Sequence, residues 1–571
     1  MTATAPTARV FLSADIDLAD IAALEGVYQK LERNLELAGT VSELEGWLAQ
    51  YGEVSDAVGE VRSARYIAMT CQTDDAARKE AYLHFVEVVD PWRKPREFEL
   101  QKKLVAHPSF AGLPAYYEVF RRSVKNAVEL FREANVPRET EIEKLAQEYQ
   151  ETCGAMTVDF DGKEQTLSQL GRVQEETDRA RRQAAWEAST KRRLADRDKL
   201  NSIFDRQLAL RQAVAKEAGF SNFRDYMFRA LERFDYAPDD CLRFHEAVER
   251  EVVPVVRLLE AGRREKMGLE KLRPWDLSVD PEGRPPLRPF QNAAELFDKT
   301  EAVFGRIDAR LRERFARLRQ DGSVDLENRK GKAPGGYQSY LPESRRPFIF
   351  MNAVGTQRDV ETLLHEGGHA IHALQSGGQR LSAYRGGAPM EFCEVASMSM
   401  ELLGAPHLEE FYAEPEARRA RRTLLEGVIQ SLPSIAATDA FQHWIYTHPG
   451  HTPAERDAAW TDLMKRFGAD VDWSGYEAQR GAGWHRILHI FEVPFYYIEY
   501  GIAQLGALQV WNRSLNGVTM AVDGYLYGLE LGGSRPLPRL FEAAGIRFDF
   551  TRETIAPLMA AVKQELAKLE N

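Results

Sequence analysis

The sequence predicts a mainly α-helical protein of two lobes with a small β-sheet, and three observations support this fold class. Apolar residues recur at helical spacing over most of the chain, as in 42–49 and 139–146. A chain of 571 residues exceeds what one hydrophobic core usually supports. Strand-like patterns are confined to a few short stretches. We place the division near residue 190, which gives an N-terminal helical lobe of residues 1–190 and a second lobe of residues 191–571.

Helices are expected from about residue 14 to 150 and again from 195 to 320. Between these regions, alternating side chains flank Asp161-Gly162 and predict a small hairpin at 156–167. Short β-like segments at 332–337 and 346–352 are bounded by Pro and Gly. Helices then continue to about 470, and the Gly-containing segment 525–534 is expected to be a loop that borders the substrate cleft described below.

Composition limits the partners and the location of the protein. The chain is 44% hydrophobic and 28% charged, which is typical of a soluble globular protein, and its net charge of −12 argues against a nucleic-acid partner. The N-terminus lacks the pattern of a signal peptide, and no apolar run approaches the ~18 residues of a membrane span. We therefore expect a cytoplasmic protein without a membrane partner.

The four cysteines are scattered through the chain without a Cys-x-x-Cys pair. This spacing favours reduced thiols over a disulfide framework or a structural zinc site. The cysteines are Cys71, Cys153, Cys241 and Cys393.

The most informative motif is His365-Glu366-Gly367-Gly368-His369. On a helix the two histidines lie about 40° apart, so both rings can bind one metal ion, while Glu366 points to the side where an attacking water would lie. This arrangement is typical of zinc peptidases, with Glu366 as the general base. The two glycines each cost about 1 kcal/mol relative to Ala in a helix, which indicates close approach of another backbone.

A catalytic zinc needs a third protein ligand, and the segment 390–403 supplies three acids at helical spacing. Glu391, Glu394 and Glu401 can share one helix face, so spacing alone leaves the choice among them open. Glu361, one turn before His365, is a candidate partner for the second nitrogen of a ligand ring.

His372 also shares the face of His365. A catalytic zinc keeps its fourth position for water, so we expect His372 to have a packing or orienting role instead of serving as a ligand.

These motifs resemble the thimet oligopeptidase and oligoendopeptidase F family of zinc metallopeptidases. The similarity covers roughly residues 200–550 and is closer to oligoendopeptidase F; besides the His motif it includes Glu394-Val-Ala-Ser397, Gly336-Tyr337 and 347–352. The resemblance implies one Zn²⁺ per chain held by His365, His369 and Glu394. It also implies a deep cleft between two helical lobes, with a β-strand along it. The family's paired glycines are absent at 491–493, so the substrate loop is expected to differ.

A dense cluster of His and Tyr follows at His489, Tyr496, Tyr497 and Tyr500. Together with the resemblance, it implies that His489, Tyr496 and Tyr500 contact the transition state. Tyr497 projects about 100° away from Tyr496 on a helix and is expected to be a core residue.

The function expected from these features is zinc-dependent hydrolysis of internal peptide bonds in oligopeptides, with folded proteins excluded. One alternative is a zinc carboxypeptidase or dipeptidase of similar helical fold, which would lose cleavage when the C-terminal carboxylate of the substrate is blocked. Another is a peptide-binding protein without turnover, although Glu366 would then have no use as a base. Oligomeric state and peptide preference stay open.

Overall fold

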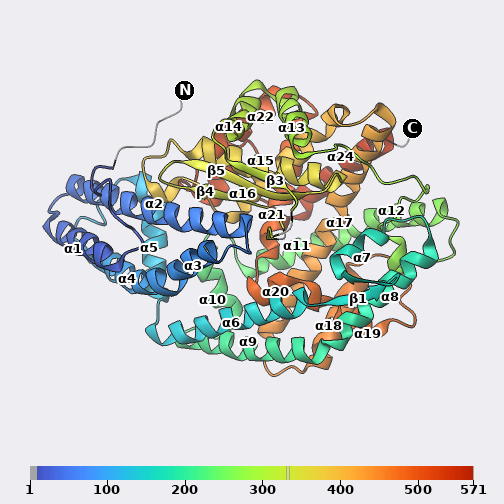
Figure 1. Ribbon diagram of the computed structural model, residues 1–571, viewed down its shortest axis with the longest axis horizontal. Helices are drawn as coiled ribbons and strands as arrows, with labels where there is room; N and C mark the ends of the chain where they lie inside the picture. Colours follow the sequence, from blue (N-terminus) through green and yellow to red (C-terminus); the bar gives the residue numbers. More distant parts are fainter. Residues whose placement is uncertain (1–8, 330, 334, 387, 570–571) are drawn as a thin grey trace. The chain divides into compact units, whose positions relative to one another are not determined.

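The computed structural model describes residues 9–329, 331–333, 335–386 and 388–569 (Figure 1), and it is mainly helical with two small sheets. The α-helices are α1 (Ile21–Leu37), α2 (Val41–Cys71), α3 (Ala76–His84), α4 (Asp90–Ala106), α5 (Glu118–Leu130), α6 (Val136–Gly154), α7 (Leu167–Val173), α8 (Arg179–Ala195), α9 (Arg197–Glu217), α10 (Phe223–Ala230), α11 (Pro238–Glu251), α12 (Val253–Lys266), α13 (Ala293–Ile307), α14 (Ala309–Gln320), α15 (Gln357–Ser376), α16 (Met390–Gly404), α17 (Glu414–Thr447), α18 (Pro453–Arg466), α19 (Glu477–Gly481), α20 (Leu488–Glu492), α21 (Tyr497–Ser514), α22 (Val518–Glu530), α23 (Leu537–Ala543) and α24 (Arg552–Lys568). The strands are β1 (Thr157–Phe160), β2 (Lys163–Thr166), β3 (Val324–Glu327), β4 (Tyr337–Leu341) and β5 (Arg346–Ala353). No helix among the described residues is long and apolar enough to cross a membrane.

The chain forms two compact units, and each unit combines three segments of the sequence. Unit 1 consists of residues 1–129, 288–421 and 506–548. Unit 2 consists of residues 130–287, 422–505 and 549–571. The expected division into residues 1–190 and 191–571 stays a prediction.

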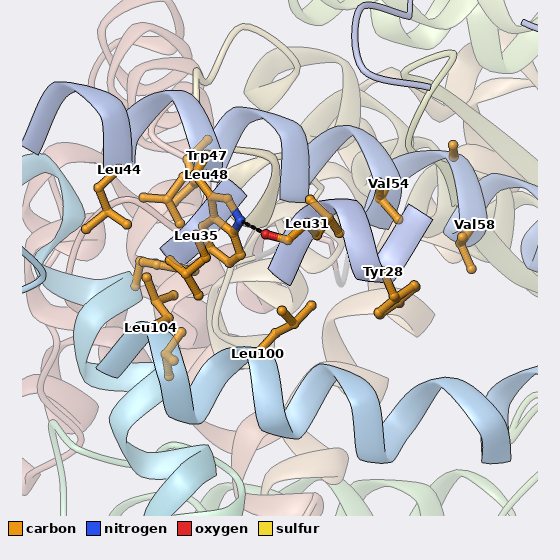
Figure 2. Close-up of a cluster of buried hydrophobic side chains, with 14 of the residues drawn as sticks. Tyr28, Leu31, Leu35, Leu44, Trp47, Leu48, Val54, Val58, Leu100 and Leu104 are labelled. Atoms are coloured by element: carbon orange, nitrogen blue, oxygen red, sulfur yellow. Dashed lines mark hydrogen bonds between the residues drawn. The ribbon is translucent and has the colours of Figure 1, made fainter. Parts of the chain in front are cut away.

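The N-terminal helices of unit 1 pack around an apolar core (Figure 2). Leu31 of α1, Leu48 of α2 and Leu104 of α4 are almost completely buried there. The indole N–H of Trp47 donates a hydrogen bond of 2.8 Å to the carbonyl of Leu31, so the one polar atom of this side chain is satisfied inside the core.

Unit 1 also holds a three-stranded sheet in the order β3-β5-β4, with β3 parallel and β4 antiparallel to β5. The central strand β5 buries Ile349, Phe350 and Met351, which explains its unbroken apolar run. Helix α15 packs against β5, and β4 forms an edge of the sheet. The expected small sheet is confirmed, and the β-like segment 346–352 lies in β5. The other strand begins only at Tyr337, the last residue of the segment 332–337, and runs to Leu341.

The hairpin expected at 156–167 is confirmed in unit 2. Strands β1 and β2 pair antiparallel, and Phe160 lies opposite Lys163. Asp161 and Gly162 form the two-residue turn with φ of 55° and 71°, the positive values that this kind of hairpin turn requires.

The loop expected at 525–534 is wrong for its first part, because Tyr525–Glu530 complete helix α22. The glycines there allow close packing: a Cβ at Gly524 would lie 2.8 Å from the carbonyl oxygen of Ala544, and one at Gly528 would lie 2.9 Å from the Cβ of Ala544. These glycines therefore reflect helix contacts and do not mark a turn.

Candidate metal centre

Helix α15 presents the His-Glu-Gly-Gly-His motif. The helix begins after Thr356, whose backbone N–H donates a hydrogen bond of 2.8 Å to the Asp359 carboxylate and so satisfies one of the free donors of the first turn. Further along, a Cβ on Gly368 would lie 2.6 Å from both the Ala396 carbonyl oxygen and the Ser397 Cα. Glycine is needed there because the backbone of α16 crosses α15 at this point.

The crossing brings together three side chains that could hold a metal ion. Donor atoms of His365, His369 and Glu394 all lie within 4.8 Å of one another. The Oε2 atom of Glu394 is 3.4 Å from Nε2 of His365 and 3.6 Å from Nε2 of His369. Tetrahedral zinc with bonds of about 2.0–2.2 Å separates its ligand atoms by roughly 3.3–3.6 Å, so this group fits a zinc ion.

Neighbouring groups orient each of the three side chains. Nδ1 of His365 donates to Oε1 of Glu401 at 2.7 Å, which leaves Nε2 facing Glu394. The ring of His369 hydrogen-bonds the backbone of Cys393. The Ser397 hydroxyl donates to Oε2 of Glu394 at 2.9 Å. Such partners fix the orientation of the ligands, and the groups that accept a hydrogen bond from His365 and His369 increase the basicity of these rings.

The two imidazoles differ in their electrostatics. Burial opposes protonation of His365, but its hydrogen bonds to Glu394 and Glu401 raise its pKa well above the ordinary value. Burial lowers the pKa of His369 to about 4. Burial also opposes ionisation of Glu394, yet the hydrogen bond from His365 and the charge of His369 hold its pKa at about 2. A metal ion must displace the proton of His365 to bind, so metal affinity depends on pH.

Glu366 lies next to this group and is only 8% exposed. Burial raises the pKa of its carboxyl to about 7, and a hydrogen bond from the backbone of Gln338 on β4 partly opposes this shift. A carboxylate with such a pKa can exchange a proton with a reacting group near neutral pH.

The other residues of the sequence prediction meet in unit 2. The ring of His489 lies 5.6 Å from that of Tyr496, 4.9 Å from that of Tyr497 and 5.8 Å from that of Tyr500, between ring centroids. Tyr497 therefore belongs to the cluster. The metal-binding group belongs to unit 1, so the assembly of both groups into one catalytic site stays a prediction.

Glu361 and His372 are the two other residues near the motif for which the sequence predicts a role. The partner of the second His365 nitrogen is Glu401, seven residues after Glu394, and not Glu361, which accepts a hydrogen bond from the amide of Gln357. His372 lies outside the three-residue group and packs near the ring of Phe392, in agreement with a packing role.

The chain is similar in sequence to known oligopeptidases. Oligopeptidase PepF of Bacillus subtilis (strain 168) is 28% identical over 327 residues, which are 56% of this chain and 47% of that protein. The chromosomal oligoendopeptidase F of Lactococcus lactis subsp. cremoris is 24% identical over 258 residues, 43% of this chain and 41% of that protein. The chain thus matches about half the length of these curated relatives.

Solved structures match over nearly the whole chain. PZ peptidase A with inhibitor 2 has a TM-score of 0.90 at 28% identity, covering 98% of this chain and 100% of that one. Oligoendopeptidase-F from Enterococcus faecium shares the fold, with a TM-score of 0.63 at 15% identity, covering 96% of this chain and 98% of that one. A sequence profile described as Peptidase family M3 matches residues 172–559, more than half of the chain. The chain therefore belongs to Peptidase family M3.

Proposed function

We propose that the protein is a zinc-dependent endopeptidase that hydrolyses internal bonds of oligopeptides. His365, His369 and Glu394 would hold one zinc ion, and Glu366 would act as the general base. The observation that carries the proposal is the convergence of two imidazole nitrogens and one carboxylate oxygen beside a buried carboxyl whose pKa is about 7. Membership of a peptidase family and the names of the oligopeptidase relatives support the substrate class.

A zinc ion bound there would polarise the peptide carbonyl and increase the acidity of the attacking water. Glu366 takes the proton of that water and later gives it to the leaving amine. Glu401 keeps the His365 ring in the orientation that leaves Nε2 available.

Strand β4 offers a way to bind the substrate. It is an edge strand, and the backbone of Gln338 on this strand hydrogen-bonds Glu366. We propose that an extended peptide pairs with β4 through its backbone, which would place peptide bonds near the base without demanding particular side chains. His489, Tyr496 and Tyr500 would donate hydrogen bonds to the oxyanion.

Zinc analysis of two matched variants tests the ligand assignment. Glu391 and Glu394 are both buried on α16, three residues apart. Glu394→Ala should contain one equivalent of zinc less than Glu391→Ala, because it loses the ion of this group; equal zinc content in the two variants would contradict the assignment.

Digestion of a random peptide pool with and without a chelator, followed by mass spectrometry of the cut sites, tests the activity. Internal cleavage that disappears with the chelator is expected. Cleavage confined to C-terminal residues would identify a carboxypeptidase instead.

A further inference from the structure

We propose that unit 2 contains a second metal site, in which Cys241, Asp439 and His443 hold a zinc ion. Donor atoms of these three residues lie within 4.8 Å of one another, as do those of His365, His369 and Glu394 in unit 1. The two groups share no residue.

Two helices supply the site. Cys241 and His245 are four residues apart on α11, and Asp439 and His443 are four residues apart on α17. Residues at this spacing lie on one face of a helix, so each helix offers a pair of polar side chains toward the other. The ring centroids of His245 and His443 are 5.7 Å apart, and the two ring planes are nearly perpendicular.

The site is almost completely buried. Cys241 and Asp439 are 0% exposed, and His443 is 5% exposed. The rings of Phe228 and Phe495 lie 6.1 and 5.6 Å from the His443 ring and form an apolar wall. Polar groups in such surroundings are costly unless they have partners.

Two of these residues nevertheless have polar atoms without a hydrogen-bond partner within the described part of the chain. These atoms include Oδ1 of Asp439 and Nδ1 of His443. Nε2 of His443 lies 3.4 Å from Oδ2 of Asp439, a separation that matches two ligands of one tetrahedral zinc ion. A metal ion would satisfy a nitrogen of His443 and a carboxylate oxygen together.

His245 completes the arrangement without being a ligand. Its Nε2 donates a hydrogen bond of 2.8 Å to Oδ2 of Asp439. A carboxylate that binds a metal commonly accepts such a bond, which fixes its orientation.

The donor set also identifies the class of metal. Sulfur, nitrogen and a single carboxylate oxygen suit zinc, whereas Mg²⁺ and Ca²⁺ prefer oxygen ligands throughout. On binding, the Cys241 thiol gives its proton to solvent and becomes a thiolate. The charges of the thiolate and the Asp439 carboxylate then balance the two positive charges of the ion, with His443 neutral.

The location suggests what the ion does. Gln442, next to His443, accepts a hydrogen bond of 2.6 Å from the backbone N–H of Phe495. Phe495 has a φ of +69°, an unusual conformation for a residue with a side chain, and it directly precedes Tyr496. The ion would therefore stabilise the part of α17 that holds the backbone leading into the His489–Tyr500 cluster.

Cobalt substitution tests the site, because a thiolate ligand gives a sulfur-to-cobalt charge-transfer band in the near ultraviolet. The full chain is produced in zinc-depleted medium with cobalt, so that the metal enters as the buried site folds. We expect two cobalt ions per chain and the charge-transfer band. The group around His365 contains no sulfur, so it contributes a cobalt ion without this band.

Three variants test which residues bind the cobalt ion that gives the charge-transfer band. Cys241→Ser should lose the band and one of the two cobalt ions, while circular dichroism verifies that it folds. Cys393→Ser, which changes the thiol beside Glu394, is the matched control and should keep the band and both ions. The double variant His365→Ala/His369→Ala should keep the band and one ion.

Wild-type protein with one cobalt ion and no band would overturn the second site, and this result requires no variant. A band that survives in folded Cys241→Ser would overturn it as well. Neither result bears on the proposed peptidase activity, which depends on the group in unit 1.

Discussion

At the residue scale, Tyr496 and Tyr500 are the strongest candidates for oxyanion donors. Their rings are 5.0 Å apart, and each lies within 6 Å of the His489 ring, measured between centroids. If a hydroxyl binds the transition state, Tyr496→Phe or Tyr500→Phe should lower kcat by on the order of 10²-fold or more with little change in KM. Steady-state kinetics on one fluorogenic peptide measures both constants.

Tyr497→Phe is the control for this prediction, since Tyr497 contacts the same histidine and is expected to have no catalytic role. Its kcat should stay near that of the wild type. Increased KM at normal kcat in both test variants would show that these tyrosines bind the substrate uniformly.

The sequence alone does not predict which of the two acids that contact His365 binds which ring nitrogen. Glu394 and Glu401 are seven residues apart and share a face of α16, as spacing predicts. Glu394 nevertheless faces Nε2 of His365, and Glu401 meets Nδ1. Which acid reaches which nitrogen depends on the point at which α16 crosses α15, a tertiary feature that helical spacing does not contain. The resemblance around Glu394–Ser397 was needed to choose between them.

At the scale of elements, the crossing of α15 and α16 depends on Gly368. A methyl group there would lie 2.6 Å from backbone atoms of Ala396 and Ser397, which cannot move without shifting the helix that carries Glu394. Gly368→Ala should therefore lower the free energy of unfolding by about 1–3 kcal/mol and weaken zinc binding. Urea unfolding and metal analysis measure the two effects.

Gly26→Ala is the matched control, because Gly26 lies within α1 and a Cβ there would meet no atom within 4 Å. This variant should gain up to about 1 kcal/mol from the helix propensity of Ala. Equal stability changes in the two variants would mean that the close approach at Gly368 is unimportant.

Glycines within helices were predicted correctly in α15 and wrongly in α22. The prediction that another backbone approaches Gly367 and Gly368 is confirmed at Gly368, which meets the backbone of α16. At Gly367 a Cβ would instead meet the ring of Phe304. The loop prediction at 525–534 is wrong over 525–530, because Gly528 lies within α22 and packs against Ala544. A helical glycine and a loop glycine differ in their neighbours, and neighbours distant in sequence are not visible in a local pattern.

At the scale of the whole molecule, stability should depend on pH through buried histidines. His485 is buried in unit 2, and its ring lies 3.2 Å from the Asn201 side-chain oxygen. Burial lowers the pKa of His485 to about 3, below the ~6.5 of an unfolded chain. The unfolded state therefore binds the proton first, and this contribution to stability is complete above pH ~6.5 and decreases as the pH falls toward 3.

His485→Gln removes this titrating group. Between pH 7 and pH 5 the wild type should lose about 2 kcal/mol more of its unfolding free energy than the variant. Urea unfolding at both pH values measures the difference. Equal losses in the two proteins would show that His485 is not the neutral, buried group described above.

The proposed peptidase activity requires zinc held by His365, His369 and Glu394, with Glu366 as the base. The most direct measurement combines metal analysis and turnover of Glu366→Gln, which keeps the size of the side chain and removes its basicity. Glu366→Gln should keep one equivalent of zinc in the group around His365, as in the wild type, and should lose turnover by at least about 10²-fold. Full zinc occupancy with turnover close to that of the wild type would contradict it.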